Sequence, residues 1–314
     1  MYYKERKMQI IENVFNISQK IQPTAIALGY FDGIHLGHQK LIESAMQIAR
    51  QKKIKSLVFT FKTHPLSVLA PNHIPKLLFS NEKKIETFES IGIDYLIFPK
   101  FTHQIMKMSP ENFVQEILVE KLNTQHVIVG FNYTFGYRGT GTPDILMKLG
   151  RKYGFEVTII EPVQVDHVTI SSSLIRKLLL DGDIKKVNKY LGRNYSISGK
   201  VIQGKGLGKK ISIPTANIEI DNSLALPRSG VYHTKILYRG KIYVSLTNIG
   251  INPTFKNHPF TIETHILNFS KDIYNEEIEI LFVDRIRPEI KFDSLEDMVA
   301  QIKKDIEDVN KLMG

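Results

Sequence analysis

The chain has 314 residues, about two domains of ordinary size, and 42% of them are hydrophobic, which excludes a disordered chain. It contains no cysteine, which excludes disulfide scaffolds, thiol nucleophiles, iron–sulfur clusters and cysteine zinc sites. Its net charge of +10 is compatible with anionic partners (nucleotides, nucleic acid or an acidic surface), but such a charge spread over 314 residues is more often a solubility feature. No segment has the pattern of a signal peptide or a membrane span.

Strand and helix patterns alternate over the first 160 residues. The strand-like runs are residues 24–30, 56–61, 93–98, 126–131 and 155–160. Apolar residues recur at helical spacing between them, and one helix has a start signal, with Ser109 as N-cap and Pro110 at its first position. This alternation predicts a parallel sheet covered on both faces, in an α/β domain that binds ligands at the carboxyl ends of its strands.

The pattern changes near residue 190. A helical stretch over residues 173–191, broken at 181–183, comes before a strand-rich part. The expected strands are residues 195–203, 231–238, 241–248, 261–269 and 277–283. Turn signals separate them, so this part is expected to be an antiparallel barrel or sandwich.

One helix is expected to close the chain. Ser294 is its N-cap and Asp297 can complete a capping box. Its apolar face comprises Leu295, Met298, Val299, Ile302, Ile306 and Val309. We therefore expect two domains, residues 1–190 and residues 191–314.

The segment most informative about function is residues 29–38, Gly-Tyr-Phe-Asp-Gly-Ile-His-Leu-Gly-His, between the first expected strand and helix. Backbone N–H groups at a helix start bind phosphate, and Gly33 and Gly37 allow close approach. His35 and His38 are three apart and face the same way, where imidazoles can stabilise charge on the α-phosphate of a nucleotide. Two incidental histidines in a turn would explain a bare His-x-Gly-His, but poorly explain the whole string.

A second group of polar residues lies in the strand-rich part. Residues 204–210 form a basic glycine-rich segment that matches neither a P-loop nor a dinucleotide fingerprint, so a flexible turn is an equal alternative. Thr215 and Asn217 follow two residues apart on an expected strand, so their side chains point the same way. Their oxygens are ligands suited to Mg²⁺.

The string at residues 29–38 resembles the signature of bacterial FMN adenylyltransferases, and residues 60–65, 129–136 and 170–176 are similar to further segments of that family in the same order. The resemblance implies a Rossmann-like nucleotidyltransferase domain that transfers AMP from ATP to FMN, with His35 and His38 as catalytic residues. It assigns ATP binding to Gly29, Phe31, Asp32, Gly37, Ser171, Ser172 and Arg176, and flavin binding to Phe61, His64 and Asn132.

The strand-rich part resembles the riboflavin kinase module of bacterial bifunctional riboflavin kinase/FAD synthetases, through residues 208–217, 230–232, 248–255 and 263–265. The resemblance implies phosphorylation of riboflavin to FMN, with Glu263 as the base for the 5′-hydroxyl. It assigns the Mg²⁺ site to Thr215 and Asn217, and kinase ATP binding to Gly204, Gly206, Gly208 and Lys209.

The chain departs from the family patterns at several positions. Lys209, Ser212 and Ile213 stand where the kinase pattern has Arg, Gly and Phe, Asn268 stands in place of Asp, and Tyr30 occupies an Asn/Thr position of the other pattern. One alternative is therefore an adenylyltransferase with a degenerate kinase-like domain. A basic nucleic-acid-binding regulator is a further alternative, although no nucleic-acid-binding motif favours it. We expect a cytoplasmic enzyme with riboflavin, FMN, ATP and Mg²⁺ as small-molecule partners, and neither nucleic acid nor membrane.

Overall fold

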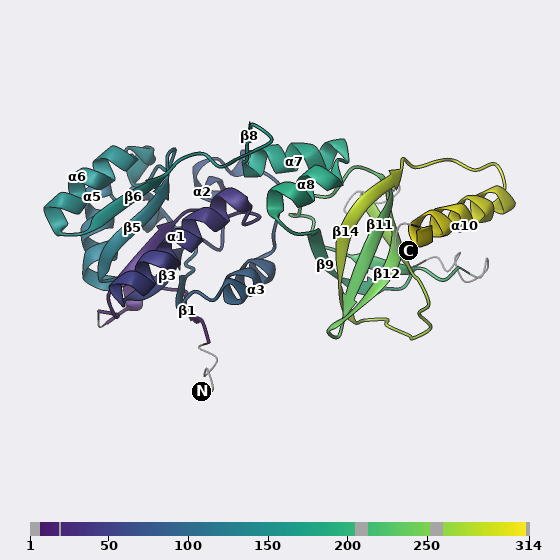
Figure 1. Cartoon of the computed structure of the whole chain (residues 1–314), viewed down its shortest axis with the longest axis horizontal. Coiled ribbons are helices and arrows are strands. Elements are labelled where there is room, and N and C mark those ends of the chain that lie inside the picture. The colour runs from purple at the N-terminus through teal and green to yellow at the C-terminus, as the bar shows by residue number, and fades with distance from the viewer. Residues whose placement is uncertain (1–6, 19, 205–212, 252–259, 312–314) are drawn as a thin grey trace. The chain divides into compact units, whose positions relative to one another are not determined.

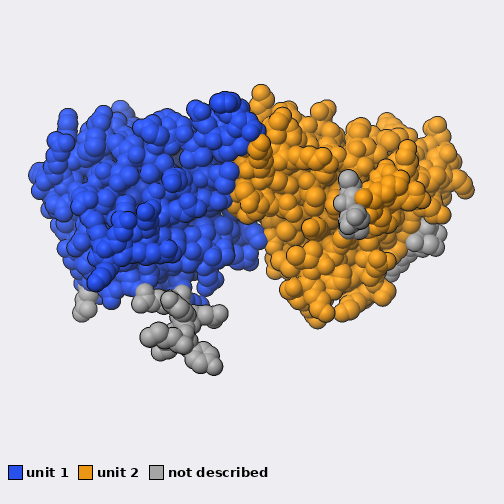
Figure 2. Space-filling model, viewed as in Figure 1, with its two compact units in different colours: residues 1–75, 79–171 blue, residues 76–78, 172–314 orange. Residues whose placement is uncertain are grey.

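The structure is a computed structural model that describes residues 7–18, 20–204, 213–251 and 260–311. The chain divides into two compact units (Figure 2), residues 1–75 with 79–171 and residues 76–78 with 172–314. The helices just before residue 190 belong to the second unit. The domain boundary expected at residue 190 stays a prediction.

The first unit is built on a six-stranded parallel sheet, ordered β1-β4-β3-β2-β5-β6. Its strands are β1 (Gln9–Ile11), β2 (Thr24–Leu28), β3 (Lys55–Phe59), β4 (Tyr95–Ile97), β5 (Thr124–Gly130) and β6 (Glu156–Ile160). The expected parallel sheet is confirmed, and the edge strand β1 is an addition to it. Because β2 lies between β3 and β5, the chain reverses its direction of strand addition at β2, and the carboxyl end of β2 is a topological switch point.

Helices and short turns surround this sheet (Figure 1). They are η1 (Val14–Asn16), α1 (Leu36–Lys52), α2 (Leu66–Leu69), η2 (Pro71–His73), α3 (Asn81–Ile91), α4 (His103–Lys107), α5 (Pro110–Asn112), η3 (Phe113–Lys121), η4 (Tyr137–Gly139) and α6 (Pro143–Tyr153). A two-stranded ribbon, β7 (Gln164–Val165) with β8 (Val168–Thr169), follows β6. Ser109 caps the segment that starts at Pro110, as expected, because its Oγ accepts the Asn112 N–H at 3.0 Å.

The sheet is buried on both faces. In β2 every residue is buried: Ile26 and Leu28 join the core on one face, and Ala25 and Ala27 join the core on the other. Alternate residues of a strand point to opposite faces, so a continuous apolar strand needs cover on both sides. This pattern explains why the central strands read as unbroken apolar runs in the sequence.

The second unit begins with two helices, α7 (Ser172–Asp181) and α8 (Ile184–Leu191). Gly182, with φ of +81°, allows the sharp turn between them, and the Asp183 side chain caps α8 by accepting the Lys186 N–H at 3.2 Å. The expected break at residues 181–183 is confirmed.

A closed antiparallel barrel follows, ordered β10-β13-β12-β11-β14-β9. Its strands are β9 (Tyr195–Ile202), β10 (Ala216–Glu219), β11 (Gly230–Tyr238), β12 (Lys241–Ile251), β13 (Phe260–Ile266) and β14 (Glu277–Arg287). The barrel expectation is confirmed. Asn217 lies on β10, as expected, whereas Thr215 comes directly before this strand. Closure leaves no exposed sheet edge.

The barrel interior contains a row of hydroxyls. They belong to Thr234 on β11, Ser245 and Thr247 on β12, and Thr264 on β13, each with 0% exposure. The Oγ1 of Thr234 is 2.7 Å from the hydroxyls of both Ser245 and Thr247, and Thr247 Oγ1 is 2.8 Å from Thr264 Oγ1. Each buried hydroxyl thus has a partner on a neighbouring strand, which satisfies polar groups that have left water.

The closing helix is α10 (Leu295–Lys311), which lies beside the barrel (Figure 1). Ser294 caps it, since its Oγ accepts the Asp297 N–H at 3.1 Å. The same Oγ is 2.6 Å from Asp297 Oδ2, so the side chains of these two residues bond to each other. Leu295 is 52% exposed, whereas Val309 is fully buried against Val231 and Leu246 of the barrel.

Candidate active sites

The expected nucleotide and flavin residues of the first unit follow adjacent strands. The segment Gly29–His38 follows β2, Phe61 and His64 follow β3, and Asn132 follows β5. Since these strands are parallel neighbours, their carboxyl ends meet at one edge of the sheet. The structure therefore gathers these groups at the switch point, where open α/β sheets bind ligands.

The segment Gly29–His38 has an unusual backbone. Phe31 has φ of 55°, Gly33 of 77° and Ile34 of 38°. Phe and Ile rarely adopt positive φ, because their Cβ atoms crowd the backbone, so such strain persists only where the surroundings hold it. Both Phe31 and Ile34 are 0% exposed within the core, and Gln39 Nε2 donates to Ile34 O at 2.9 Å. Burial thus fixes the shape of this loop in advance of any ligand.

His35 and His38 form a stacked pair at the start of α1. Their ring centroids are 3.7 Å apart and the rings are 19° from parallel. His35 is the N-cap of α1 and is 5% exposed, and its Nδ1 accepts the His38 N–H at 3.4 Å. Because Nδ1 is an acceptor, the proton of neutral His35 is on Nε2. The pair can therefore present ring N–H donors where the helix dipole also favours an anion.

Two residues of this loop that are expected at ATP have buried side chains. Phe31 is 0% exposed and Asp32 is 2% exposed. The ring of Phe31 meets His38 edge-on at 5.2 Å, and Asp32 Oδ1 accepts the Phe79 N–H at 3.3 Å. Both side chains therefore pack within the protein and help to hold the loop, and a direct role at ATP stays a prediction for them.

Gly29 and Gly37 leave space that neighbouring rings occupy. A Cβ at Gly29 would lie 3.0 Å from the Phe31 ring, and a Cβ at Gly37 would lie 3.0 Å from Cε1 of His35. Such contacts are tighter than most real Cβ contacts, so a larger residue would displace the ring. Glycine at position 37 thus preserves the stack of His35 on His38.

The expected flavin residues differ in burial. Phe61 is half-buried, with its ring 5.4 Å from Phe59 and 5.1 Å from Phe101. His64 is also half-buried and meets the ring of Tyr30 edge-on at 4.5 Å, whereas Asn132 is exposed. An aromatic surface beside exposed polar groups suits a flat, partly polar ligand. Their assignment to flavin stays a prediction.

The remaining residues expected to bind ATP come from the last segment that resembles the adenylyltransferase family, residues 170–176. Ser171 is the last residue of the first unit, and Ser172 is the first residue of α7. Arg176 is one turn further along α7, and its Nε donates to Lys76 O at 2.6 Å within the second unit. The expected role of these three residues at ATP stays a prediction.

In the barrel, strand register brings distant polar residues side by side. Asn217 of β10 pairs with Glu263 of β13, and Glu263 pairs on its other side with Asn248 of β12. Directly opposite residues on one face have Cβ atoms about 5 Å apart. The expected base and one expected Mg²⁺ ligand are therefore neighbours, and Asn248 joins them.

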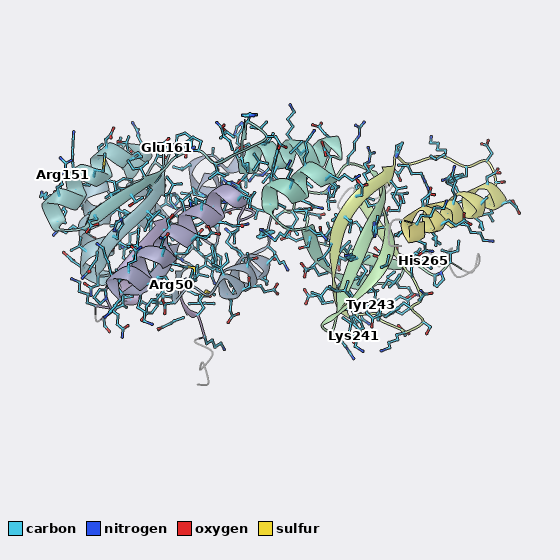
Figure 3. The ribbon with its side chains drawn as sticks, viewed as in Figure 1. Arg50, Arg151, Glu161, Lys241, Tyr243 and His265 are labelled. Carbon is cyan, nitrogen blue, oxygen red and sulfur yellow. The ribbon has the colours of Figure 1, made fainter. Side chains whose placement is uncertain are left out.

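Glu263 lines a cavity of about 260 Å³ between the barrel and α10. The cavity is also lined by Ile213, Thr215, Asn248, Arg287, Met298 and Asp305. Ile213, which stands in place of Phe, is 7% exposed, so its aliphatic side chain forms part of the wall. His265, labelled in Figure 3, also lines the cavity, and its Nδ1 is 2.8 Å from Pro214 O.

A buried ion pair fixes α10 against this cavity. Arg287 Nε lies 3.1 Å and 3.0 Å from the two carboxylate oxygens of Asp305, and Arg287 Nη2 lies 2.8 Å from Oδ2. Gln301 Nε2 also donates to Asp305 Oδ1 at 2.8 Å. Such a bidentate pair sets the orientation of the helix as well as holding it.

Thr215 is shared with a second cavity, of about 230 Å³, which is also lined by Thr264, Phe269 and Tyr274. Gly204 lies close by, because a Cβ there would be 2.0 Å from Asn217 Nδ2. The backbone of Gly204 therefore packs directly against the side-chain amide of Asn217. The other expected ATP residues of the kinase part, Gly206, Gly208 and Lys209, lie outside the described residues, as does Ser212.

Sequence reasoning did not assign roles to several residues that the structure places at these sites. Asn248 was visible as the first residue of a family-like segment, but its place beside Glu263 depends on register. Arg287 and Asp305 lie 18 residues apart on a strand and a helix, without a local pattern to connect them. Lys84 is the clearest such case, since it is 2% exposed below the Gly29–His38 loop.

Comparison with known proteins assigns a family to each part of the chain. The family model described as FAD synthetase matches residues 17–174, and the riboflavin kinase model matches residues 191–313. The chain is 40% identical over 287 residues to the bifunctional riboflavin kinase/FMN adenylyltransferase of Listeria monocytogenes, and covers 90% of that protein. The chain belongs to this family. The kinase domain is present, over residues 191–313, and is not a degenerate remnant.

Other members of the family agree along most of the chain. The Bacillus subtilis relative is 38% identical over 92% of this chain and 92% of its own, and the Escherichia coli K12 relative is 31% identical over 95% and 96%. Both carry the name bifunctional riboflavin kinase/FMN adenylyltransferase.

One solved structure matches nearly the whole fold. It has a TM-score of 0.88 and 30% identity, covers 96% of this chain and 98% of that chain, and is titled "Macrolide-efflux Protein from Streptococcus pneumoniae". Within residues 7–311 as far as they are described, no helix is both long enough and apolar enough to cross a membrane.

Proposed function

We propose that this chain makes FAD from riboflavin in two ATP-dependent steps. The second unit phosphorylates riboflavin to FMN, and the first unit transfers AMP from another ATP to FMN. The observation that supports the proposal is that each family match falls on a part of the chain where several expected site residues lie near one another. In one part they follow β2, β3 and β5 at the switch point, and in the other Glu263 and Asn217 belong to the row that Asn248 extends.

In the kinase step, Glu263 acts as the base. Its carboxylate takes the proton of the riboflavin 5′-hydroxyl, whose oxygen attacks the γ-phosphorus of ATP while ADP leaves. The cavity of about 260 Å³ beside Glu263 is the expected position for the flavin, closed on one side by α10. Asn217 and Asn248 flank the carboxylate and orient it.

The residues around Asn217 fit Mg²⁺. The Thr215 hydroxyl and the Asn217 amide oxygen are hard oxygen donors, and the glycine at position 204 lets the backbone approach the amide closely. Thr215 and Asn217 would hold the ion. When bound, it would offset negative charge on the phosphates of ATP.

In the adenylyl step, a phosphate oxygen of FMN attacks the α-phosphorus of ATP and pyrophosphate leaves. His35 and His38 donate ring N–H groups to the phosphate oxygens, where charge accumulates in the transition state. The start of α1 adds backbone N–H groups to the same position. Buried Phe31 and Ile34 hold the loop in this shape, so little reorganisation is needed during reaction.

The test supplies the purified chain with riboflavin, ATP and Mg²⁺ and separates the flavins by chromatography. We expect FMN and then FAD, and we expect FAD when FMN replaces riboflavin. FAD from FMN without any FMN from riboflavin would refute the kinase step, and no FAD from FMN would refute the adenylyl step. Omission of Mg²⁺ is expected to stop both reactions.

The cytoplasmic location and the lack of a nucleic-acid partner remain expectations from the sequence. The net charge of +10 offers a direct check. A protein that binds nucleic acid through phosphates loses affinity log-linearly with salt. We expect only weak, salt-sensitive binding of RNA or DNA alongside specific binding of flavin and ATP.

A further inference from the structure

Lys84 is a buried cation directly below the Gly29–His38 loop. It lies on α3 and is 2% exposed. Its Nζ donates to Tyr30 O at 3.1 Å and lies 4.1 Å from the centre of the Tyr30 ring and 5.8 Å from that of Phe98. A buried ammonium group costs free energy unless its partners compensate for lost water, so its retention at this position calls for an explanation.

The need for a hydrogen-bond donor to Tyr30 O does not by itself explain why position 84 carries a charged side chain. Thr60 Oγ1 also donates to Tyr30 O, at 2.7 Å. A carbonyl needs one donor to avoid the cost of an unsatisfied acceptor, and the Thr60 hydroxyl supplies it. An apolar side chain of the same length at position 84 would therefore leave this carbonyl bonded.

The Tyr30 ring connects Lys84 with His64. The ammonium lies over the face of the ring, and the His64 ring meets it edge-on at a centroid distance of 4.5 Å and an angle of 71°. His64 Nδ1 accepts the Leu66 N–H at 3.1 Å, so neutral His64 carries its proton on Nε2 and can donate from there. Tyr30 occupies the position where the family pattern has Asn or Thr, so this connection depends on a departure from that pattern.

We propose that Lys84, Tyr30 and His64 form one positioning unit for adenylyl transfer, in which the ammonium holds the carbonyl and ring of Tyr30, and the ring holds His64 as a hydrogen-bond donor to a substrate phosphate. This inference rests on the proposed function of the first unit. The phosphate belongs either to FMN or to ATP, and the kinetics of the two substrates distinguish them. Lys84 is a positioning residue, since it acts through Tyr30.

The groups around Lys84 determine the pH range over which its ammonium keeps its contacts with Tyr30. Burial lowers the pKa of Lys84 to about 8, and the Asp32 carboxylate acts in the opposite direction. His64 faces it across the Tyr30 ring, and Lys62, which pairs with Glu12 at 2.5 Å, lies 5.9 Å from the same Phe98 ring. Loss of the Lys84 proton would weaken both the cation–π contact and the bond to Tyr30 O. We therefore expect FAD formation to decline above pH 8, the value set by this lysine.

The experiment uses the full chain and compares Lys84→Met and Lys84→Arg, with FMN formation from riboflavin as an internal measure of folding. For Lys84→Met we expect kcat/KM of FAD formation to fall roughly 30-fold, the loss of a charged hydrogen bond. We expect FMN formation to be unchanged and the melting temperature to shift by less than about 4 °C. Lys84→Arg should recover activity to within about fivefold, since a guanidinium also stacks on aromatic rings.

Two further measurements separate positioning from a structural role. The decline above pH 8 should disappear in Lys84→Met and move to higher pH in Lys84→Arg. A higher KM for FMN would place His64 at the flavin phosphate, and a higher KM for ATP would place it at the nucleotide. Lys83→Met is the matched control, because the neighbouring Lys83 Nζ pairs with Glu86 at 3.3 Å, and this variant should keep the unaltered rates and pH profile.

The outcomes that overturn the inference are distinct from those that overturn the function. An unaltered chain that forms no FAD from FMN refutes the proposed function. A Lys84→Met chain that forms FAD with unchanged kcat/KM and unchanged pH profile refutes only the positioning unit. If Lys84→Met unfolds and loses both activities, the pH dependence of FAD formation by the unaltered enzyme is the test. A rate that stays constant through pH 8 overturns the inference. A decline above pH 8 that moves to higher pH in Lys84→Arg supports it.

Discussion

In the first unit, both expected catalytic histidines and four of the residues expected to bind ATP lie within ten positions, Gly29–His38, at the end of one strand. In the barrel, Asn217, Asn248 and Glu263 come from three different strands and meet only through strand register. The first arrangement is held by local backbone strain and burial, and the second by pairing between distant segments.

The difference determines what kind of change should damage each site. A substitution in the Gly29–His38 loop acts on its immediate neighbours, as Gly37 does on His35. A slip of one residue in β13 would turn Glu263 to the other face of the barrel and remove it from the row. Because the two activities belong to one chain, each serves as the control for the other.

The largest effect is expected for Glu263→Gln, which keeps shape and removes the base. FMN formation from riboflavin should fall roughly a thousandfold, as for loss of a general base. FAD formation from FMN should be unchanged. Glu277→Gln, at an exposed position of β14, is the matched control and should leave both rates unaltered. Equal loss of both activities in folded Glu263→Gln protein would refute the separation of the two sites.

The next largest effect is expected for His38→Ala in the other unit. Loss of one donor to the developing charge should reduce kcat of FAD formation roughly a hundredfold, while FMN formation stays intact. Steady-state rates with FMN and ATP measure the first, and riboflavin phosphorylation the second. The exposed His73 offers a control through His73→Ala. Unchanged FAD formation in His38→Ala would contradict the assignment of the stacked pair.

A smaller effect is expected for Gly204→Ala. The new Cβ would lie 2.0 Å from Asn217 Nδ2, so the amide must turn away. We expect the Mg²⁺ concentration for half-maximal FMN formation to rise about tenfold, since one oxygen ligand is misplaced, and FAD formation to stay constant. Gly240→Ala is the comparison, because a Cβ there has no atom within 4 Å. Its φ of +74° adds backbone strain, so it shows what a loss of stability without contact at Asn217 does to FMN formation. An unaltered Mg²⁺ dependence would argue against Asn217 as a ligand.

No effect on either activity is expected at the amino ends of the parallel strands, where Asp94 comes directly before β4. Asp94 there accepts hydrogen bonds from Lys55 Nζ at 2.7 Å, the Ser56 N–H at 3.0 Å and Ser56 Oγ at 2.9 Å. Burial acts to raise the pKa of Asp94, but the hydrogen bonds from Lys55 and Ser56 outweigh it and hold the pKa below its usual value. Asp94→Asn should lower the free energy of unfolding by about 1–2 kcal/mol at neutral pH and change neither activity.

The sign of its pH dependence follows from the lowered pKa. The folded state holds Asp94 ionised where the unfolded chain would take up a proton, so the stabilisation is complete above the unfolded pKa of about 3.9 and is lost as pH falls through the lower folded value. Urea unfolding gives the free energy of unfolding of Asp94→Asn and of the unaltered chain. The difference between the two should be large at pH 7 and small near pH 3. Glu43→Gln on the exposed face of α1 is the control. A difference that grows on acidification would contradict the role of Asp94.

The sequence predicted what local pattern controls. The string Gly29–His38 lies between a strand and a helix, as expected, because glycines and histidines interrupt an apolar run there. The parallel sheet, the barrel and the break between α7 and α8 followed from periodicity and turn residues. The edge strand β1 escaped prediction because it has only three residues. The strand β10, of four residues, was expected from Thr215 and Asn217, but its bounds were not predicted.

What depends on distant contacts could not be predicted. Lys83 and Lys84 are adjacent and identical in sequence, yet one pairs with Glu86 and the other is 2% exposed below Tyr30. The pairing of Asn217 with Glu263 requires the register of two strands, which no local pattern encodes. Asp305 lies on the helix face expected to be apolar, and only the structure shows that Arg287 is its partner.

The hydroxyl row in the barrel constrains how this part of the molecule can vary over evolutionary time. Thr234, Ser245, Thr247 and Thr264 satisfy one another across three strands. A change of Thr234 or Thr247 to an aliphatic residue would leave the hydroxyl of Ser245 or Thr264 without the partner described, whereas matched changes on two strands would cost much less. A substitution at one of these positions is therefore tolerated best when its partner on the next strand is also substituted, so these positions should vary jointly among relatives.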